Sequence, residues 1–244
     1  MNVSLFQAAA AMTANEQWQD KISQNMVSSS LPGFKRQDLS FSSVAAGLMG
    51  PSGQHFQLPS AQSVTNFSPG ELKLTGLKTD VAIEGDGFFE VRMPNGTTSY
   101  TRDGEFHVSA TGELVSKEGF QVIGDGGPIH LDPNNPNPMS ISPEGQVSQG
   151  AELKGRIKVV DFKDPRLLKA IGGSHFVAEN PDAQPREMQK PSVRQGFLEA
   201  GNTSPVTEMA TLIGVMRTFE ANQRIMQMHD ERMGKVITEL AGTN

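Results

Sequence analysis

The sequence predicts an α+β protein, in which a long helix at each end of the chain flanks a central antiparallel all-β domain. Three observations support this fold class. The first 31 residues contain no glycine or proline, the C-terminal part of the chain carries a mostly apolar stripe at an unbroken spacing of three and four residues, and the middle alternates apolar and polar residues with a period of two. With 244 residues, the chain is long enough for one large domain or two small ones.

The N-terminal helix is expected within residues 1–34. Alanine fills positions 8 to 11, and Pro32-Gly33 ends the helix because proline and glycine both disfavour its continuation. Steps of three and four residues trace an apolar stripe that is typical of a coiled-coil seam. Its apolar members include Leu5, Met12, Ile22 and Met26, and polar residues interrupt it at Asn15 and Gln19.

The C-terminal helix is expected within residues 200–244, with Pro205 in its first turn. Over about 36 residues at about 1.5 Å each, it would be about 50 Å long, more than a small domain needs. We therefore expect the two helices to pair antiparallel as a coiled-coil-like arm, with surplus apolar surface facing other copies of the chain. The polar stripe positions either set the register or face water. The predicted packing residues of this helix are Met209, Leu212, Met216, Phe219, Met226 and Met233.

The central β-domain is expected at residues 70–199, and a Ser/Gly/Pro-rich extended connector is expected at residues 35–69. Asn95-Gly96 between two alternating runs is a strong hairpin signal. Glycine next to an acidic residue is typical of turns, because the Asp side chain can bond the nearby backbone. The predicted β-turn residues are Gly85, Asp86, Gly87, Asn95, Gly96, Asp103 and Gly104.

Composition argues against several classes of protein. The formal net charge is −6 and the basic residues do not cluster, so we expect no nucleic-acid partner. The absence of cysteine excludes disulfides and thiolate metal sites. No apolar run approaches the roughly 18 residues of a membrane span, and the N-terminus does not have the pattern of a cleaved signal peptide.

An enzyme remains an alternative because Glu84, Asp86 and Asp103 are carboxylates capable of acid–base chemistry. Each of them, however, stands in a turn signal. The five histidines do not have metal-ligand spacing, and phosphate-loop, dinucleotide-binding and nucleophile-elbow motifs are missing. We therefore predict no catalytic residues, no metal, no cofactor and no small-molecule substrate.

Three stretches together resemble the bacterial flagellar rod and hook proteins. The segment "DKISQNMVSSSLPGFKR" is similar to the N-terminal signature of that family, "IEGDGFFEVRMPNGTTSYTRDGEF" to its shared β-domain, and "QGFLEAGNTSPVTEMATLIGVMRTFEANQRIMQ" to its C-terminal helix. The chain departs from the N-terminal family signature at "QNMVS" and at Pro32, and these differences affect details of the helix end. The N-terminal motif residues are Asp20, Ile22, Ser23, Asn25, Gly33, Phe34, Lys35 and Arg36.

The resemblance implies a structural subunit that self-assembles helically into the basal-body rod, the drive shaft that crosses the periplasm. It implies that the chain is exported by the flagellar type III apparatus without signal cleavage, and that its partners are its own copies and other rod and hook subunits. At 244 residues the chain has no room for the additional β-domains of hook proteins. The region after Arg36 is shorter than the extra segment of the distal rod protein, which favours the short proximal rod protein, and the distal rod protein is the alternative within the family. A β-domain binding module with helical dimerisation arms is the alternative outside it.

Overall fold

The computed structural model describes residues 3–49 and 55–241 of the chain. The chain divides into two compact units, and both are assembled from segments that are distant in the sequence. Unit 1 comprises Met1–Val27, Gln37–Val64 and Pro205–Asn244, and unit 2 comprises Ser28–Arg36 and Thr65–Ser204.

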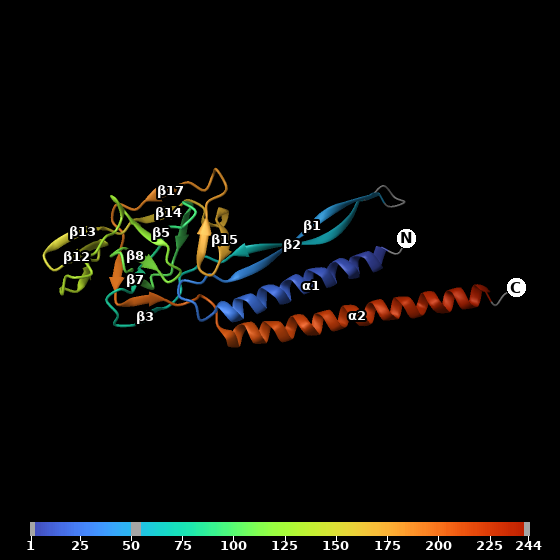
Figure 1. The fold of residues 1–244 in the computed structure, drawn as a ribbon. Helices are drawn as coiled ribbons and strands as arrows, with labels where there is room; N and C mark the ends of the chain where they lie inside the picture. The colour runs from blue at the N-terminus through green and yellow to red at the C-terminus, as the bar shows by residue number, and fades with distance from the viewer. Residues whose placement is uncertain (1–2, 50–54, 242–244) are drawn as a thin grey trace. The chain divides into compact units, whose positions relative to one another are not determined.

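Unit 1 contains two long helices and a two-stranded sheet (Figure 1). Helix α1 runs over Val3–Ser28 and helix α2 over Pro205–Ala241. Strands β1 (Gln37–Met49) and β2 (His55–Thr65) pair with each other, so the Ser/Gly/Pro-rich segment after α1 forms a β-ribbon.

Polar and aromatic contacts join α1 to strand β1. The Asn25 side chain donates to the Gln37 carbonyl oxygen at 2.8 Å and accepts from the Gln37 backbone N–H at 2.9 Å. The rings of Trp18 and Phe41 meet edge to face, with their centroids 5.6 Å apart. The amide of Asn25 therefore acts as a surrogate backbone partner for a strand, which explains why this polar residue is buried.

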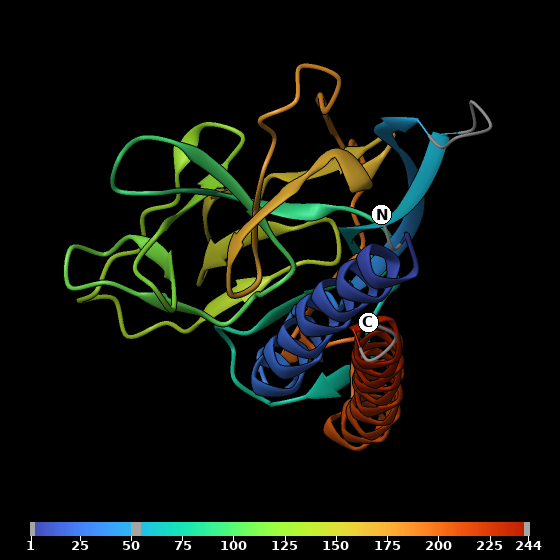
Figure 2. The same cartoon turned by 90° about the vertical axis from the view of Figure 1, so that its right-hand side faces the viewer.

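The prediction of a coiled-coil-like arm is wrong. The two helices are present, but within the described residues they do not form a long coiled-coil pair, and Figure 2 shows their axes inclined to each other. On α2 the predicted seam residues Met209 and Met216 are about half exposed, at 53% and 49%. The buried residues are their immediate predecessors, Glu208 and Val215, which lie on a face rotated by about 100°.

The physical reason for this error is that an apolar stripe identifies a face of a helix but not what covers it. Among the α1 side chains that the structure describes, the buried residues are Ala14, Asn15, Ile22 and Asn25, so two of the four are polar, and Asn25 is bound to β1. In the described part of the chain, more residues lie in strands than in helices, and one long helix lies near each end.

Unit 2 is built from antiparallel β-strands, in agreement with the prediction of a central β-domain. Its main sheet has the strand order β15-β16-β6-β5-β9-β8-β7, with β10 beside β9 and with β14 joining β5 to β17. The bounds are β5 (Phe88–Arg92), β6 (Thr98–Thr101), β7 (Phe106–Val108), β8 (Leu114–Ser116), β9 (Gln121–Gly124), β10 (Gly127–Pro128), β14 (Val159–Phe162), β15 (Lys169–Gly172), β16 (His175–Val177) and β17 (Pro185–Glu187).

Smaller sheets complete unit 2. One has three strands in the order β11-β12-β13, and two more are the pairs β18-β4 and β19-β3. A short 3₁₀ helix at Pro165–Leu167 precedes β15. The bounds are β3 (Leu72–Leu74), β4 (Val81–Ile83), β11 (Met139–Ile141), β12 (Gln146–Gln149), β13 (Glu152–Arg156), β18 (Val193–Gln195) and β19 (Phe197–Glu199).

The main sheet buries apolar side chains on both of its faces. Consecutive residues of β5 enter different core clusters: Phe89 packs with Val91, Leu114 and others, whereas Phe88 packs with aromatic residues such as Phe176. Successive side chains of a strand point to opposite faces of the sheet. A strand whose two faces are both covered therefore carries apolar residues at consecutive positions. The run "FFEV" of β5 is therefore a central strand of the core.

Candidate functional site

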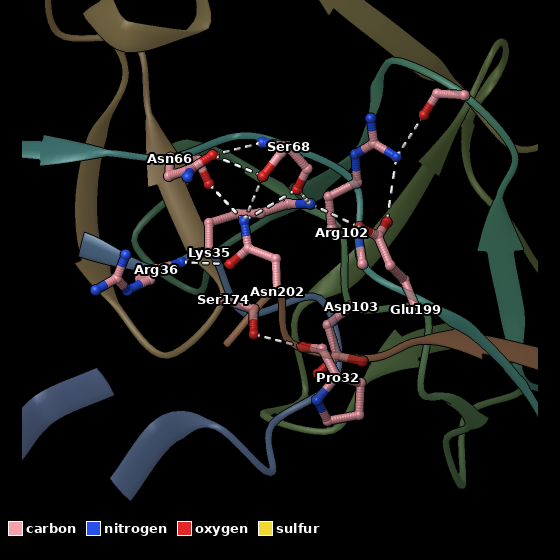
Figure 3. Close-up of polar contacts among 12 residues, drawn as sticks. Pro32, Lys35, Arg36, Asn66, Ser68, Arg102, Asp103, Ser174, Glu199 and Asn202 are labelled. Carbon is pink, nitrogen blue, oxygen red and sulfur yellow. Dashed lines mark hydrogen bonds and ion pairs between the residues drawn. The ribbon is translucent and has the colours of Figure 1, made fainter. Parts of the chain in front are cut away.

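Every covalent connection between the two units passes through a small part of unit 2. The chain changes unit four times, between residues 27 and 28, 36 and 37, 64 and 65, and 204 and 205. On the unit 2 side of these changes lie three segments: residues 28–36, 65–70 and 199–204. Their polar groups bind one another and two residues of the main sheet region, Arg102 and Ser174 (Figure 3). We call this set of three segments and Arg102 the node.

A buried ion-pair triad lies at the centre of the node. Lys35 Nζ is 2.6 Å from Glu199 Oε1, and Arg102 Nη1 is 3.2 Å from Glu199 Oε2. Lys35 and Glu199 are each 1% exposed. Two further hydrogen bonds go to the backbone: Lys35 donates to the Ser68 carbonyl oxygen at 2.9 Å, and Glu199 accepts from the Gly70 N–H at 2.8 Å. One carboxylate thus joins all three segments to Arg102.

Burial sets the electrostatics of the triad. Desolvation lowers the pKa of Lys35 and that of Arg102, and the nearby Glu199 carboxylate opposes both shifts. The Arg102 guanidinium also donates to the Gly85 carbonyl oxygen at 2.8 Å and lies over the Phe88 ring at 5.2 Å. Two basic side chains share one carboxylate. Each of them therefore also depends on its backbone contact, Lys35 on the Ser68 carbonyl oxygen and Arg102 on the Gly85 carbonyl oxygen.

Asn202 is the second connecting residue of the node. Its side-chain oxygen accepts from the Arg36 backbone N–H at 2.6 Å. Its side-chain nitrogen donates to the carbonyl oxygens of Asn66 at 2.8 Å and Ser68 at 3.0 Å. Because a planar amide offers both a donor and an acceptor, one side chain satisfies backbone groups from two different segments.

Glycine is required at position 33 for two reasons. Its φ is +65°, which is left-handed, and a Cβ there would lie 2.3 Å from the Arg102 carbonyl carbon and from the Asp103 nitrogen. The Gly33 N–H donates to the Glu199 carbonyl oxygen at 2.7 Å. The neighbouring Pro32 carbonyl oxygen accepts from the Ser174 hydroxyl at 2.6 Å. Two consecutive residues after α1 are therefore hydrogen-bonded to two different segments of unit 2.

The predicted family-motif residues fall into two groups. Asp20, Ile22, Ser23 and Asn25 lie on α1, where Ile22 and Asn25 are buried and Asp20 and Ser23 are exposed. The residues from Gly33 to Arg36 belong to the node. Sequence reasoning missed Arg102, Glu199 and Asn202. A signal was available, because Glu199 and Asn202 stand in "LEAGN" of the C-terminal stretch, but a linear pattern does not show that it meets Lys35.

The predicted packing residues on the helices are distributed unevenly. Ile22 is buried, whereas Met12 and Met26 on α1 and Leu212, Phe219 and Met226 on α2 are half-buried. Met209, Met216 and Met233 are about half exposed. The side chain of Leu5 lies outside the described residues. A stripe of exposed apolar side chains at spacings of three and four runs along the first part of α2: Val206, Met209, Ile213 and Met216.

The acidic residues of the glycine-rich loops are not brought together as a catalytic group. Glu84 is exposed and forms a two-pronged ion pair with Arg194, at 2.7 and 3.1 Å. Asp86 is exposed. Asp103 is buried and accepts from the Glu105 N–H at 2.9 Å, and burial raises the pKa of its carboxyl to about 6. These different surroundings give no shared pocket for acid–base work.

The predicted turn residues have several roles. The turn between β5 and β6 closes with a hydrogen bond from the Gly96 N–H to the Met93 carbonyl oxygen at 2.9 Å. Gly85, Gly87 and Gly96 have positive φ. Gly104 does not, but a Cβ there would lie 1.7 Å from the Val81 carbonyl oxygen, so glycine is needed for a close approach of two backbones.

One cluster in unit 2 has the connectivity of a Ser-His-Glu triad. Ser99 Oγ is 3.1 Å from His175 Nδ1, and His175 Nε2 is 3.2 Å from Glu118 Oε2. Ser99, however, is 0% exposed on the central strand β6. A nucleophile must reach its substrate, so this arrangement ties β6 to β16 and to the turn after β8 and does not form an active site.

Two further searches of the described residues were negative. No group of three or more His, Asp or Glu side chains is placed to hold a metal ion. Neither α1 nor α2, over the parts described, is long and apolar enough to cross a membrane.

Comparison with known proteins identifies the family. Residues 82–149 match the model of the flagellar hook protein FlgE/F/G D1 domain, and residues 194–239 match that of the flagellar basal body rod FlgEFG protein C-terminal region. The flagellar basal-body rod protein FlgG of Borreliella burgdorferi is 32% identical over 258 residues, which cover 95% of this chain and 96% of the relative. The rod protein FlgF of Mesorhizobium japonicum is 33% identical over 228 residues, and that of Caulobacter vibrioides is 34% identical over 229. They cover 93% of this chain and 93% of the relative in the first case, and 89% and 92% in the second. The chain therefore belongs to the family of flagellar basal-body rod proteins.

Proposed function

We propose that this chain is a structural subunit of the flagellar basal-body rod and not an enzyme. The observation that carries the proposal is similarity over nearly the full length to relatives named as rod proteins. The stripe of exposed apolar residues on α2 is consistent with it, because a subunit of a polymer must keep apolar surface for its neighbours.

The α2 stripe supports contacts with other subunits of the rod. Its residues Met209, Ile213 and Met216 are about half exposed in the single chain. Burying a large apolar side chain contributes roughly 1.5–3 kcal/mol, so a few such residues per contact, repeated along a polymer, would give a stiff shaft. A contact between two different surfaces of identical subunits extends into a filament when its rotation does not close a ring.

The length of the chain favours the shorter type of rod protein. The alignment with the FlgF of Mesorhizobium japonicum spans 228 positions and covers 93% of each chain. The alignment with the Borreliella FlgG spans 258 positions although this chain has only 244 residues, so the FlgG contains residues without a counterpart here. We therefore propose the short, proximal position in the rod, with the distal position as the alternative.

Export without a cleaved signal peptide through the flagellar type III apparatus, and a location in the rod across the periplasm, belong to the same proposal. They are supported by the family to which the chain belongs.

Deletion of the gene tests the proposal directly. Electron microscopy of basal bodies isolated from the deletion strain should show a missing or truncated rod, and the position of the truncation should give the axial level. Restoration of the full rod by the intact gene is the control. Complete rods in the deletion strain would refute the structural role.

A further inference from the structure

The three segments of the node adjoin all four points at which the chain passes from one unit to the other. Residues 28–36 lie between the first and second changes, residues 65–70 follow the third, and residues 199–204 precede the fourth. Any force that acts on α1, on the β-ribbon or on α2 reaches unit 2 through the covalent chain at these places.

The three segments are bound to one another by reciprocal contacts. The Asn66 N–H donates to the Arg36 carbonyl oxygen at 2.8 Å, and the Asn202 N–H donates to that of Phe34 at 3.2 Å. The side chains of Lys35 and Asn202 both donate to the Ser68 carbonyl oxygen. No segment can leave the node without breaking hydrogen bonds that hold the other two.

Burial makes these contacts expensive to break one at a time. Lys35 and Glu199 are excluded from water, and removing one partner of a buried pair leaves a charge that is not compensated. The contacts of Asn202 end on backbone carbonyls that would lose their donors. Phe67 of the node packs on Phe88 and Phe176, and Arg102 lies over Phe88, but the buried members of both core clusters are residues outside the node. We therefore expect the node to open while the core stays folded.

We propose that the node is a mechanical anchor, which makes the four chain crossings respond together when force is transmitted between the two units of a subunit. Lys35 and Asn202 are positioning residues, because their hydrogen bonds hold the three segments in one place. The cellular part of this inference rests on the proposed function as a rod subunit, and the cooperative behaviour of the node does not.

Hydrogen exchange of the purified full-length chain tests the cooperativity. The variant Asn202→Asp keeps the size of the side chain and its acceptor for the Arg36 N–H but replaces two donors by an anion. We expect exchange at the Gly33, Asn66 and Gly70 amides to accelerate together, by about tenfold or more, because each of these amides is bonded within the node. The same amides should respond in Lys35→Met.

Matched controls separate the node from general destabilisation. Asn134→Asp and Lys73→Met make the same chemical changes at exposed positions and should leave the node amides unchanged. Amides of β5 and β9 report on the core. Acceleration confined to the segment that carries the substitution would overturn the proposal, and so would equal acceleration in β5 and β9.

Swimming at increasing viscosity tests the mechanical role in the parent bacterium. Cells with Asn202→Asp should assemble complete rods but lose speed more steeply than the wild type as the load rises. Unchanged swimming at every viscosity, or absent rods, would overturn the mechanical role. A deletion strain with normal rods would instead refute the proposed function, while the exchange result would still decide whether the node is cooperative.

Discussion

The core of unit 2 and the outer face of α2 use the same kinds of apolar residue for different purposes. In unit 2, side chains such as Val91, Leu114 and Val122 are 0% exposed and are covered by strands of the same chain. On α2, Met209 and Met216 stay about half exposed. The comparison teaches that unit 2 covers its apolar side chains with its own strands, whereas α2 leaves an apolar stripe exposed in the single chain.

The largest effect on stability is expected inside unit 2. Leu114→Ala should lower the free energy of unfolding by about 2–5 kcal/mol, because it leaves a cavity in a closed core. Leu74→Ala removes the same atoms from a side chain that is 73% exposed and should change stability by less than about 0.5 kcal/mol. Urea denaturation followed by circular dichroism measures both. Equal losses would show that the core is not the closed region described here.

A second test concerns the node within unit 2. Gly33→Ala should destabilise by about 2–4 kcal/mol, because left-handed strain adds to a clash with the backbone of Arg102. Gly96→Ala has a similar φ of +82° but open space around it, so only strain of about 1–2 kcal/mol is expected. Similar unfolding free energies for the two variants would show that the close packing at Gly33 is unimportant.

A third prediction concerns pH. Burial raises the pKa of Asp103 to about 6, so the folded chain binds more protons at this carboxyl than the unfolded chain does between about pH 4 and pH 6. This residue therefore lowers stability as the pH rises through that window. Asp103→Asn should remove the penalty and stabilise the chain at pH 7.5 by up to about 2–3 kcal/mol, with little gain at pH 4.

Urea denaturation at both pH values measures this difference, and Asp182→Asn is the control because it makes the same change at an exposed position. A gain from Asp103→Asn that is the same at pH 4 and pH 7.5 would contradict the assignment to ionisation of this carboxyl.

The smallest effect on stability should accompany the largest effect on assembly. Met216→Asp lies on the exposed stripe and should cost the isolated chain less than about 1 kcal/mol, mostly through helix propensity. In cells it should abolish motility, because a charge would enter the proposed contact between subunits. Thr218→Asp, on the opposite side of α2, is the matched control. Normal swimming of cells with Met216→Asp would refute the role of the stripe.

Much of the fold was predictable because it depends on local patterns. The alternation of "FFEVRM" predicts a strand, Asn95-Gly96 predicts the turn after it, and the lack of glycine and proline before Pro32 predicts α1. The order of the strands in the main sheet was not predictable, because β5 pairs with β14 from about 70 residues further along the chain. Such pairings depend on which apolar faces fit together in three dimensions.

The candidate site was only half visible in the sequence. The resemblance identified Gly33, Lys35 and Arg36 as a motif, but their partners Arg102 and Glu199 are 67 and 164 positions away from Lys35. The predicted seam of α2 shares Met209 and Met216 with the exposed stripe, whereas the predicted pairing of α2 with α1 as a coiled-coil arm was wrong. A periodic pattern records that a face is apolar and does not record its neighbour.

The sequence by itself determined the two helices, the β-rich middle and the family, because backbone propensity, period and motif order are properties of the linear chain. Only the tertiary structure decided that Asn25 binds a strand, that Asp103 is buried, and that Lys35 meets Glu199 and Arg102. The physical reason is that burial and charge pairing depend on which distant segments share a low-dielectric interior, and contacts of that range leave no periodic trace in the sequence.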